Sequence, residues 1–205
     1  MSGTAVDGID AALTEISGAG YAIQAELLKG ITYPYSADVR SRILAICANE
    51  PVTLAELADL DDAIANQFIQ AIHALDVDLA SIDLIGSHGQ TLHHRPPRPE
   101  RLGHTLQLGR GDLIAKATSC RTVSNFRTAD IALGGQGAPL VPLIDACLLS
   151  RADCDLAVQN IGGIGNVTYL PPWPKLFSGS STCPTTPPTG VPSTTTPRPP
   201  AATSR

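Results

Sequence analysis

The sequence predicts an α/β fold, because short apolar runs typical of strands alternate with segments of helical periodicity. The clearest helix begins at Thr53-Leu-Ala-Glu56, a capping box in which the threonine hydroxyl accepts from a backbone N–H and the glutamate reaches back. Behind this box, large apolar residues recur at spacings of three and four as far as Leu75. The other apolar runs are short and end at polar or glycine residues, as strands do. We find no internal repeat.

Each further element follows from a local signal. Apolar residues alternate with small or polar ones over Ile9–Thr14, which is typical of a strand. A helix ends before Pro51, because proline disfavours a helical residue in front of it, whereas Pro139 is tolerated in a first helical turn. The expected elements are strands at 9–14 and 21–28, helices at 38–49 and 53–75, strands at 82–85 and 105–108, a helix at 111–118, a strand at 121–124, a helix at 139–149, and strands at 156–160 and 166–170.

Composition excludes several functional classes. The 205 residues carry 14 basic and 19 acidic side chains, a net charge of -5, which argues against binding to nucleic acid. No apolar run is long enough to span a membrane, and the first ten residues lack the basic start of a secretory signal. The cysteines form no CxxC pair, so we expect reduced thiols in a cytoplasmic protein; they are Cys47, Cys120, Cys147, Cys154 and Cys183.

The composition changes abruptly near the end of the chain. Residues 171–205 hold 10 of the 17 prolines, with 8 Thr, 5 Ser and no acidic residue. Residues 1–170 hold all 19 acidic residues and 11 of the basic ones, a net charge of -8. We expect the tail to be disordered and to have neither helical nor strand periodicity.

Two glycine-containing turns are candidates for phosphate binding. The first runs from Gly3 to Gly8, and Asp7 and Asp10 are hard oxygen ligands for Mg²⁺. On this segment alone, an ordinary β-turn is the favoured interpretation. The second is the run Gly162-Gly-Ile-Gly-Asn166 between two apolar strands. Because one such turn stands at each end of an α/β body, a nucleotide held between two lobes is suggested, although neither turn is a Walker A loop.

Polar residues follow a predicted strand at Ser87-His-Gly-Gln-Thr91. Residues just past the carboxyl ends of strands line the ligand crevice in α/β folds, and these types suit a ligand with many hydroxyl groups. A histidine held in an ordinary turn is an equal alternative for His88. Three further histidines lie nearby, but no cysteine or acidic residue at ligand spacing accompanies them, which disfavours a metal site; they are His93, His94 and His104.

The region richest in glycine and polar residues runs from Asn125 to Pro142. Arg127 can bind a carboxylate or phosphate through two N–H groups, and Asp130 can accept from a hydroxyl or pair with Arg127. The alternative is a structural loop held by that internal ion pair. We favour a ligand loop, because loops this rich in glycine commonly carry function.

Five motifs together resemble those of the anhydro-N-acetylmuramic acid kinase family, in the family's order and approximate spacing over residues 1–170. They are Met1-Ser-Gly-Thr with Asp7-Gly8, Gly86-Ser-His-Gly-Gln-Thr91, Asn125-Phe-Arg127, Gly134-Gly-Gln-Gly-Ala-Pro-Leu-Val-Pro142 and Asn160-Ile-Gly-Gly-Ile-Gly-Asn-Val-Thr168. The resemblance implies the fold of actin, sugar kinases and heat-shock chaperones, in which two α/β lobes close on ATP. It also implies ATP- and Mg²⁺-dependent hydrolytic opening and phosphorylation of 1,6-anhydro-N-acetylmuramic acid, in bacterial cytoplasmic cell-wall recycling.

The resemblance assigns residues by their motifs. The ATP-binding candidates are Gly3, Thr4, Ala5, Val6, Asp7, Gly8, Ile9, Asp10, Asn160, Gly162, Gly163 and Asn166, with Asp7 also the candidate Mg²⁺ ligand. The sugar-binding candidates are Ser87, His88, Gln90, Thr91, Arg127, Asp130 and Gln136. The implied partners are ATP and an anhydro-amino sugar, with neither nucleic acid nor membrane. The oligomeric state is left open.

The chain departs from the family pattern in several places. Ala5 and Val6 replace the usual Ser-Leu, and Asn125 replaces a common Asp, which removes a charge from the sugar side. The family has an apolar strand before the position of Met1, so an upstream start is expected. It also continues, after the second glycine turn, into Gly-Phe-Asp-x-Gly-Pro-Gly-Asn, which supplies the catalytic aspartate. Nothing after Leu170 is expected to match, and no residue is assigned as catalytic base.

Three hypotheses follow. The chain is a kinase of this family, or a catalytically inactive fragment whose tail is a frameshift or truncation product, or a binding domain carrying a Pro/Thr-rich linker. We favour the kinase lineage with an inactive chain. The expected domains are a first lobe at 1–155, the first hairpin of a second lobe at 156–170, and a low-complexity tail at 171–205. Without its second lobe, the chain is expected to expose apolar surface.

Overall fold

The structure is a computed structural model that describes residues 6–161, 165–172 and 193–196. The chain divides into two compact units. Unit 1 comprises residues 1–14 and 27–138, and unit 2 comprises residues 15–26 and 139–205. The division after Ala138 lies before the lobe boundary expected at residue 155. The mixed α/β character of the described residues confirms the predicted fold class.

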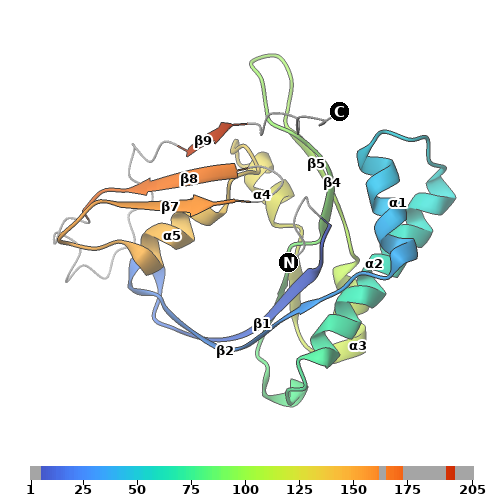
Figure 1. The fold of residues 1–205 in the computed structure, drawn as a ribbon, viewed down its shortest axis with the longest axis horizontal. Coiled ribbons are helices and arrows are strands. Elements are labelled where there is room, and N and C mark those ends of the chain that lie inside the picture. Colours follow the sequence, from blue (N-terminus) through green and yellow to red (C-terminus); the bar gives the residue numbers. More distant parts are fainter. Residues whose placement is uncertain (1–5, 162–164, 173–192, 197–205) are drawn as a thin grey trace, which may run out of the picture. The chain divides into compact units, whose positions relative to one another are not determined.

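The elements follow one another along the chain as Figure 1 shows. They are β1 (Ile9–Ser17), the 3₁₀ turn η1 (Gly20–Ala22), β2 (Gln24–Tyr33), α1 (Ala37–Cys47), α2 (Leu54–Ala74), the 3₁₀ turn η2 (Leu79–Ser81), β3 (Ile85–Ser87), β4 (Gln90–Arg95), β5 (His104–Leu108), α3 (Gly111–Thr118), β6 (Thr122–Ser124), α4 (Phe126–Ala132), α5 (Val141–Leu149), β7 (Leu156–Asn160), β8 (Gly165–Leu170) and β9 (Ser193–Thr196).

Besides parts of the paired strands β1 and β2, which form a hairpin, unit 1 contains two short sheets. β3 and β6 pair in parallel, with Ile85 opposite Thr122 and Ser87 opposite Ser124. β4 and β5 form an antiparallel pair from Gln90, opposite Leu108, to the far end of the ribbon, with a register shift near its start. Helices α1 and α2 pack beside this ribbon, and α3 packs on α2 (Figure 1). Helices α1 and α2 therefore pack on the β4–β5 sheet, and α3 packs on β6 of the other sheet.

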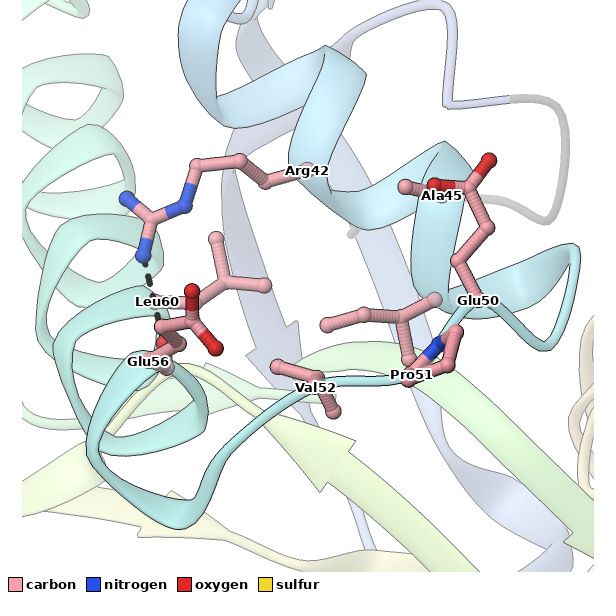
Figure 2. A pocket seen from close by; sticks show the side chains of 8 residues that line it. Arg42, Ala45, Glu50, Pro51, Val52, Glu56 and Leu60 are labelled. Atoms are coloured by element: carbon pink, nitrogen blue, oxygen red, sulfur yellow. Dashed lines mark hydrogen bonds between the residues drawn. The ribbon is translucent and has the colours of Figure 1, made fainter.

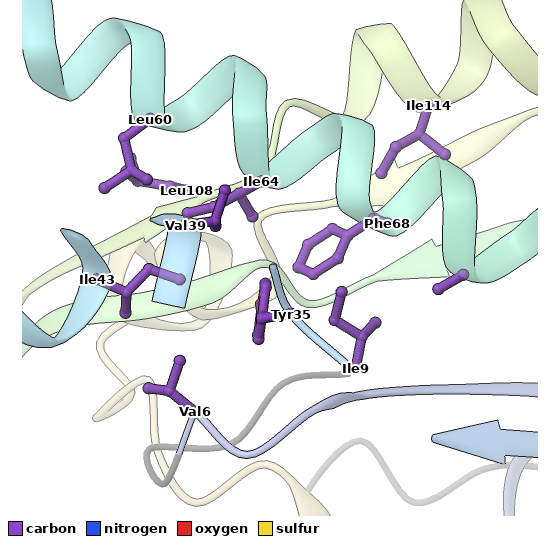
Figure 3. Close-up of a cluster of buried hydrophobic side chains, with 11 residues drawn as sticks. Val6, Ile9, Tyr35, Val39, Ile43, Leu60, Ile64, Phe68, Leu108 and Ile114 are labelled. Carbon is purple, nitrogen blue, oxygen red and sulfur yellow. The ribbon is translucent and has the colours of Figure 1, made fainter. Parts of the chain in front are cut away.

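The core of unit 1 is one apolar cluster, and Figure 3 shows its side chains converging between α1, α2 and β5. Ile43, Leu60, Ile64 and Ile114 are fully buried. Three large apolar α2 residues at a spacing of four, Leu60, Ile64 and Phe68, belong to this cluster, as the sequence pattern predicts. Its members are Val6, Ile9, Tyr35, Val39, Ile43, Leu60, Ile64, Phe68, Ala71, Leu108 and Ile114.

The capping box at the start of α2 is formed as predicted. The Thr53 hydroxyl accepts from the Glu56 backbone N–H at 3.2 Å, and Glu56 Oε2 accepts from the Thr53 N–H at 2.8 Å. The Thr53 hydroxyl also donates to the Glu56 carboxylate at 2.7 Å, and together these bonds hold the pKa of Glu56 below its ordinary value. Two backbone donors that a helix start leaves unpaired are thereby satisfied.

Unit 2 is a small sheet with one helix packed on it. β7 and β8 form an antiparallel hairpin in which Leu156 lies opposite Leu170 and Asn160 opposite Asn166. α5 packs against β8 and against η1. β9 pairs antiparallel with the other edge of β8, so the tail contributes a strand that its composition did not predict. The rest of residues 173–205 lies outside the described part.

Several elements differ from the sequence prediction. β4 and α4 were not among the elements expected from the sequence. β3 begins at Ile85 rather than at residue 82, since the preceding residues form η2 and a connector. The second strand begins at Gln24, after η1, and runs to Tyr33. Among the described residues, no helix is long and apolar enough to cross a membrane.

We expect Thr53→Ala to lower the free energy of unfolding by about 1 kcal/mol, because it removes the hydroxyl that caps α2. Urea denaturation followed by circular dichroism measures the change. Asn66→Ala is the matched control, since Asn66 is exposed in the interior of the same helix, where alanine is the better helix former. Equal stability of Thr53→Ala and the unaltered chain would contradict the role given to the cap.

Candidate functional site

The candidate site lies where β3 and β6 end. The parallel register places Ser87 beside Ser124, so the residues after each strand emerge at the same edge. His88 follows the first strand, and Asn125 follows the second in a left-handed conformation, φ 61°, that turns the chain directly into α4. Backbone pairing thus brings together two motifs that are distant in sequence.

A cavity of about 270 Å³ opens at this edge. It is bounded by the ends of β3, β5 and β6, the start of α3 and one residue of α2. Its wall is mostly polar, with a carboxylate, a guanidinium, an imidazole, hydroxyls and amides. The lining residues are Asp61, Ser87, His88, Gly89, Thr105, Leu106, Gln107, Leu108, Gly109, Arg110, Gly111, Ser124, Asn125 and Thr128.

A hydrogen bond joins the two motifs. Arg127 Nε lies 2.8 Å from His88 Nε2, and His88 Nδ1 lies 2.9 Å from the Gly89 carbonyl oxygen. Because an arginine Nε always carries a hydrogen, His88 Nε2 must be the acceptor and the ring proton must be on Nδ1. The imidazole is therefore neutral and held in one tautomer. Arg127 also donates from Nη1 to the Gly137 carbonyl at 3.2 Å.

The environment of both side chains favours this arrangement. Burial lowers the pKa of His88 most strongly, and the nearby Arg127 charge lowers it further, against the opposing effect of the Gly89 carbonyl. Burial also lowers the pKa of Arg127, which nevertheless remains a cation. In the described residues no carboxylate forms an ion pair with Arg127. Its two hydrogen-bond partners are neutral, so its charge is not compensated.

Asp130 supports Arg127 indirectly. The ion pair between them, which the sequence left open as the alternative to a ligand loop, is absent from the described structure; instead, Asp130 Oδ2 accepts from the Gly137 N–H at 2.7 Å. The backbone of Gly137 therefore links the aspartate to the arginine, donating to one and accepting from the other. Gly137 has φ +72°, and a Cβ there would lie 2.8 Å from Ile131 Cδ1. Only glycine fits this turn without strain.

Of the seven predicted sugar-side residues, only Ser87 and His88 line the cavity; Gln90, Thr91, Arg127, Asp130 and Gln136 are not part of its wall. Gln90 is completely buried, and its Oε1 accepts from the Tyr35 hydroxyl at 3.2 Å. The side chain of Thr91 accepts from Gln107 Nε2 at 3.3 Å, so it touches the cavity wall only through Gln107. Gly89, with φ +77°, permits the tight turn before β4, since a Cβ there would lie 2.9 Å from the Leu108 carbonyl oxygen. Gln136 is exposed.

The first glycine turn is only partly described, since Gly3, Thr4 and Ala5 lie outside the described residues. Val6 is buried with φ 50°, and its carbonyl accepts from Arg40 Nε at 2.8 Å. Asp7 is exposed. Asp10 Oδ1 accepts from the Thr32 hydroxyl at 2.7 Å, which fixes that carboxylate against β2. Gly8 and Ile9 are buried, and Ile9 belongs to the core cluster.

The second glycine turn is flanked by a matched pair, Asn160 and Asn166, at the end of the β7–β8 hairpin. The Gln159 amide donates to both of their backbone carbonyls, at 3.2 Å and 3.0 Å. Gly162 and Gly163 lie outside the described residues.

The sequence reasoning missed several cavity residues, among them three polar ones that strands or helices bring in from elsewhere. Asp61, on α2, accepts a hydrogen bond from the Gly109 N–H at 2.6 Å and forms part of the cavity wall. Gln107 lies on β5, and its Oε1 is buried without a hydrogen-bond partner among the described atoms. Thr128 lies one turn along α4 from Asn125. Of these three residues, only Asp61 had a recognisable place in the sequence pattern, and that pattern put it on the polar face of α2.

A second, smaller cavity of about 120 Å³ lies between α1 and α2 (Figure 2). Two of its charged groups, Arg42 and Glu56, are engaged at the start of α2, and a third, Glu50, also lines it. Arg42 Nη2 donates to the Glu56 carbonyl at 3.2 Å, and the Glu56 carboxylate belongs to the capping box. Besides the Glu50 carboxylate, this cavity offers a ligand mainly the apolar side chains of Val52 and Leu60.

The histidines of the β4–β5 ribbon do not gather into a metal site. The His93 and His104 rings have centroids 6.4 Å apart, and among the described residues no group of three potential metal ligands is found.

Comparison with known proteins identifies the class and then the family. An α/β chain of this kind is part of a sugar-kinase-type ATPase domain, and a family model for anhydro-N-acetylmuramic acid kinase matches residues 1–185. The chain belongs to the anhydro-N-acetylmuramic acid kinase family. This match extends beyond Leu170, where the likeness was expected to end, so that boundary was placed too early.

The curated relatives carry the same name. A protein from Synechocystis sp. is 55% identical over 192 residues, covering 90% of this chain and 50% of the relative. One from Trichormus variabilis is 56% identical over 176 residues, with coverage of 83% and 45%. One from Acaryochloris marina is 58% identical over 173 residues, with coverage of 84% and 45%. The chain spans about half the length of the curated relatives it matches.

We expect the fold to lose stability as the pH falls through the range in which an unfolded histidine takes up a proton, near about 6.5. The folded state resists protonation of His88, so the unfolded state binds more protons there and stability rises with pH. In His88→Gln, whose amide oxygen can still accept from Arg127, the slope of unfolding free energy against pH should be shallower. Urea denaturation at pH values between about 5 and 7.5 measures it.

His104→Gln is the control, because His104 is exposed at the far end of the β4–β5 ribbon. It should leave the slope unchanged. Identical slopes for His88→Gln and the unaltered chain would show that His88 is not held neutral by the fold.

Proposed function

We propose that this chain is the sugar-binding N-terminal part of an ATP-dependent anhydro-N-acetylmuramic acid kinase. The single observation that carries the proposal is the uncompensated Arg127 cation, oriented by His88 beside a polar cavity. The family membership gives the reaction class, and the relatives' printed name gives the sugar. In this proposal residues 1–155 form the first lobe, and residues 156–170 begin the second.

The chemistry of the site suits such a substrate. A muramic acid sugar carries a carboxylate, an amide and hydroxyls, all of which accept hydrogen bonds. Arg127 retains Nη2 for an acceptor after its Nε and Nη1 donate to His88 and Gly137. Ser87 and Thr128 offer hydroxyls, and Asn125 offers an amide. Asp61 accepts on the opposite wall, where a sugar hydroxyl can donate.

The phosphate side is assigned to the two glycine turns, each through its backbone N–H groups. Within the first turn, Asp7 is the exposed carboxylate and Asp10 is engaged by Thr32, so Asp7 is the better candidate to hold Mg²⁺. One protein carboxylate is sufficient for an ion that completes its coordination with phosphate oxygens and water. The Mg²⁺-bound nucleotide supplies the phosphoryl group and neutralises charge on it.

The proposed reaction breaks the bond between C1 and O6 of the anhydro ring. Water adds at C1 and gives its proton to a base, while O6 takes the phosphoryl group from ATP and ADP leaves. His88 and Arg127 orient the sugar for this step, and the cavity wall excludes bulk water around it. No residue of this sequence is assigned as the base, so we expect these 205 residues to bind the sugar without turning it over.

We expect Arg127→Gln to weaken binding of anhydro-N-acetylmuramic acid by about tenfold or more, because a hydrogen bond to a charged group contributes about 1.5–3 kcal/mol. Isothermal titration calorimetry with the full chain measures it. Arg121→Gln is the matched control, since Arg121 is an exposed arginine just before β6. Absence of binding by the unaltered chain would overturn the proposed function, and unchanged affinity of Arg127→Gln would overturn its central residue.

Incubation of the full chain with ATP, Mg²⁺ and the anhydro-sugar tests the catalytic part. We expect no phosphorylated sugar above background by mass spectrometry, while binding is retained. Turnover at the rate of the Synechocystis relative, run alongside, would show that a base is present in this chain after all.

A further inference from the structure

The segment that follows α4 is held in place by one residue, Asp130. The Asp130 carbonyl accepts from the Gly135 N–H at 2.8 Å and from the Leu133 N–H at 3.2 Å. Its carboxylate reaches further along the segment, where Oδ2 accepts from the Gly137 N–H at 2.7 Å. Three backbone donors between residues 133 and 137 therefore end on a single aspartate, which satisfies them without help from a ligand.

Two glycines of this segment make room for the arrangement. A Cβ on Gly135 would overlap the Asp130 carboxylate, and a Cβ on Gly137 would collide with Ile131. Gly137 also has φ +72°, a conformation that favours glycine. The glycines at these two positions therefore serve to seat an internal side chain, which is a role distinct from direct contact with a ligand.

The anchoring of Gly137 reaches Arg127. The Gly137 carbonyl accepts from Arg127 Nη1 at 3.2 Å, while His88 Nε2 accepts from Arg127 Nε at 2.8 Å. The guanidinium is thus fixed at two points, and Asp130 in turn fixes one of them. An arginine side chain has much rotamer freedom to lose when it is ordered. Ordering it before a ligand arrives removes that cost from the binding step.

Two other roles for Asp130 are disfavoured. The residue is not part of the cavity wall, so it is not placed to bind a ligand there. No ion pair joins it to Arg127 in the part of the chain that the structure describes, so it does not act as the counter-charge of that cation. What Asp130 supplies is an acceptor oxygen at a set position, and the amide oxygen of an asparagine could supply the same.

We propose that Asp130 is a positioning residue of the sugar site. Its carboxylate fixes Gly137, and Gly137 holds the guanidinium of Arg127 with Nη2 left for the ligand. This inference deepens the proposed function and rests on it for the role of Arg127 toward the sugar. The chain of contacts from Asp130 to Arg127 is independent of that role and is tested separately.

The first test uses nuclear magnetic resonance of the ¹⁵N-labelled 205-residue chain without sugar or nucleotide. The Nε–H signal of Arg127 is identified as the one missing from Arg127→Gln. We expect its proton to exchange with solvent about tenfold faster or more in Asp130→Ala, because the guanidinium loses one of its two fixed points. Asp130→Asn should stay within about threefold of the unaltered chain, since its amide oxygen can still accept from Gly137.

Asp83→Ala is the matched control, because Asp83 is an exposed aspartate just before β3, and it should leave the exchange rate unchanged. Gly135→Ala is a second way to displace the carboxylate, since the added Cβ would overlap it, and it should accelerate exchange as Asp130→Ala does. It also decides the question if Asp130→Ala does not fold. An unchanged exchange rate in Gly135→Ala would overturn the proposal, and so would equal acceleration in Asp130→Asn and Asp130→Ala, which would make charge the cause.

The second test is calorimetry with anhydro-N-acetylmuramic acid. Asp130→Ala should weaken binding by about tenfold, as Arg127→Gln does, and the double variant should bind within about twofold of Arg127→Gln alone, because both changes remove one contact. Losses that multiply to about a hundredfold would show that Asp130 binds the sugar itself, which overturns the proposal. If the unaltered chain binds no sugar, the proposed function is wrong, and the exchange measurement alone decides whether Asp130 positions Arg127.

Discussion

The parallel pairing of β3 with β6 is the contact on which the candidate site depends. Each strand is only three residues long, yet their register sets Ser87 beside Ser124 and so sends two distant loops out at one edge. His88 and Arg127 lie 39 positions apart in the sequence, and this strand pairing brings them within hydrogen-bond distance. The core cluster, to which α2 contributes Leu60, Ile64, Phe68 and Ala71, also includes Leu108 of β5 and Ile114 of α3.

The site pairs the neutral imidazole of His88 with the guanidinium cation of Arg127, and the hydrogen bond between them fixes the tautomer of the imidazole. His88 accepts from Arg127 because its own proton is committed to Gly89. Arg127 is in turn held from behind by Gly137, whose N–H is anchored on Asp130. A half-buried cation surrounded by neutral acceptors costs desolvation energy that an anionic or polar ligand can recover. This arrangement is better suited to recognising a ligand than to stabilising the empty fold.

Much of the fold could be predicted from sequence, because its strongest signals are local. The capping box at Thr53, the apolar spacing of α2 and the helix at Gly111–Thr118 depend on neighbouring residues alone. α4 could not be predicted in this way, since a left-handed Asn125 and a glycine-rich end disguise a short helix as a loop. Asp61 was missed for a different reason: it reaches the cavity only through the packing of α2 against β5.

The predicted site residues differ in the same way: the position of some follows from local sequence, and the position of others follows from packing. Ser87 and His88 line the cavity because they follow a strand whose end the sequence located within a few residues. Gln90, two positions further on, is turned into the core by the antiparallel pairing that starts there, and alternation of faces in a strand decides this rather than residue type. The polar residues indicated which segment of the sequence forms the site. Which of them face the cavity and which face the core is decided by the strand register.

The division of the chain into units has a consequence for its synthesis. Unit 2 takes in the tip of the β1–β2 hairpin, residues 15–26, and then nothing until Pro139. On the ribosome, η1 therefore emerges long before α5, the helix on which it packs, and all of Leu27–Ala138 is made in between. Unit 1 can collapse around its core as it appears, whereas the hairpin tip must wait for its partner. The order of translation thus makes unit 2 the last part of the described chain to assemble.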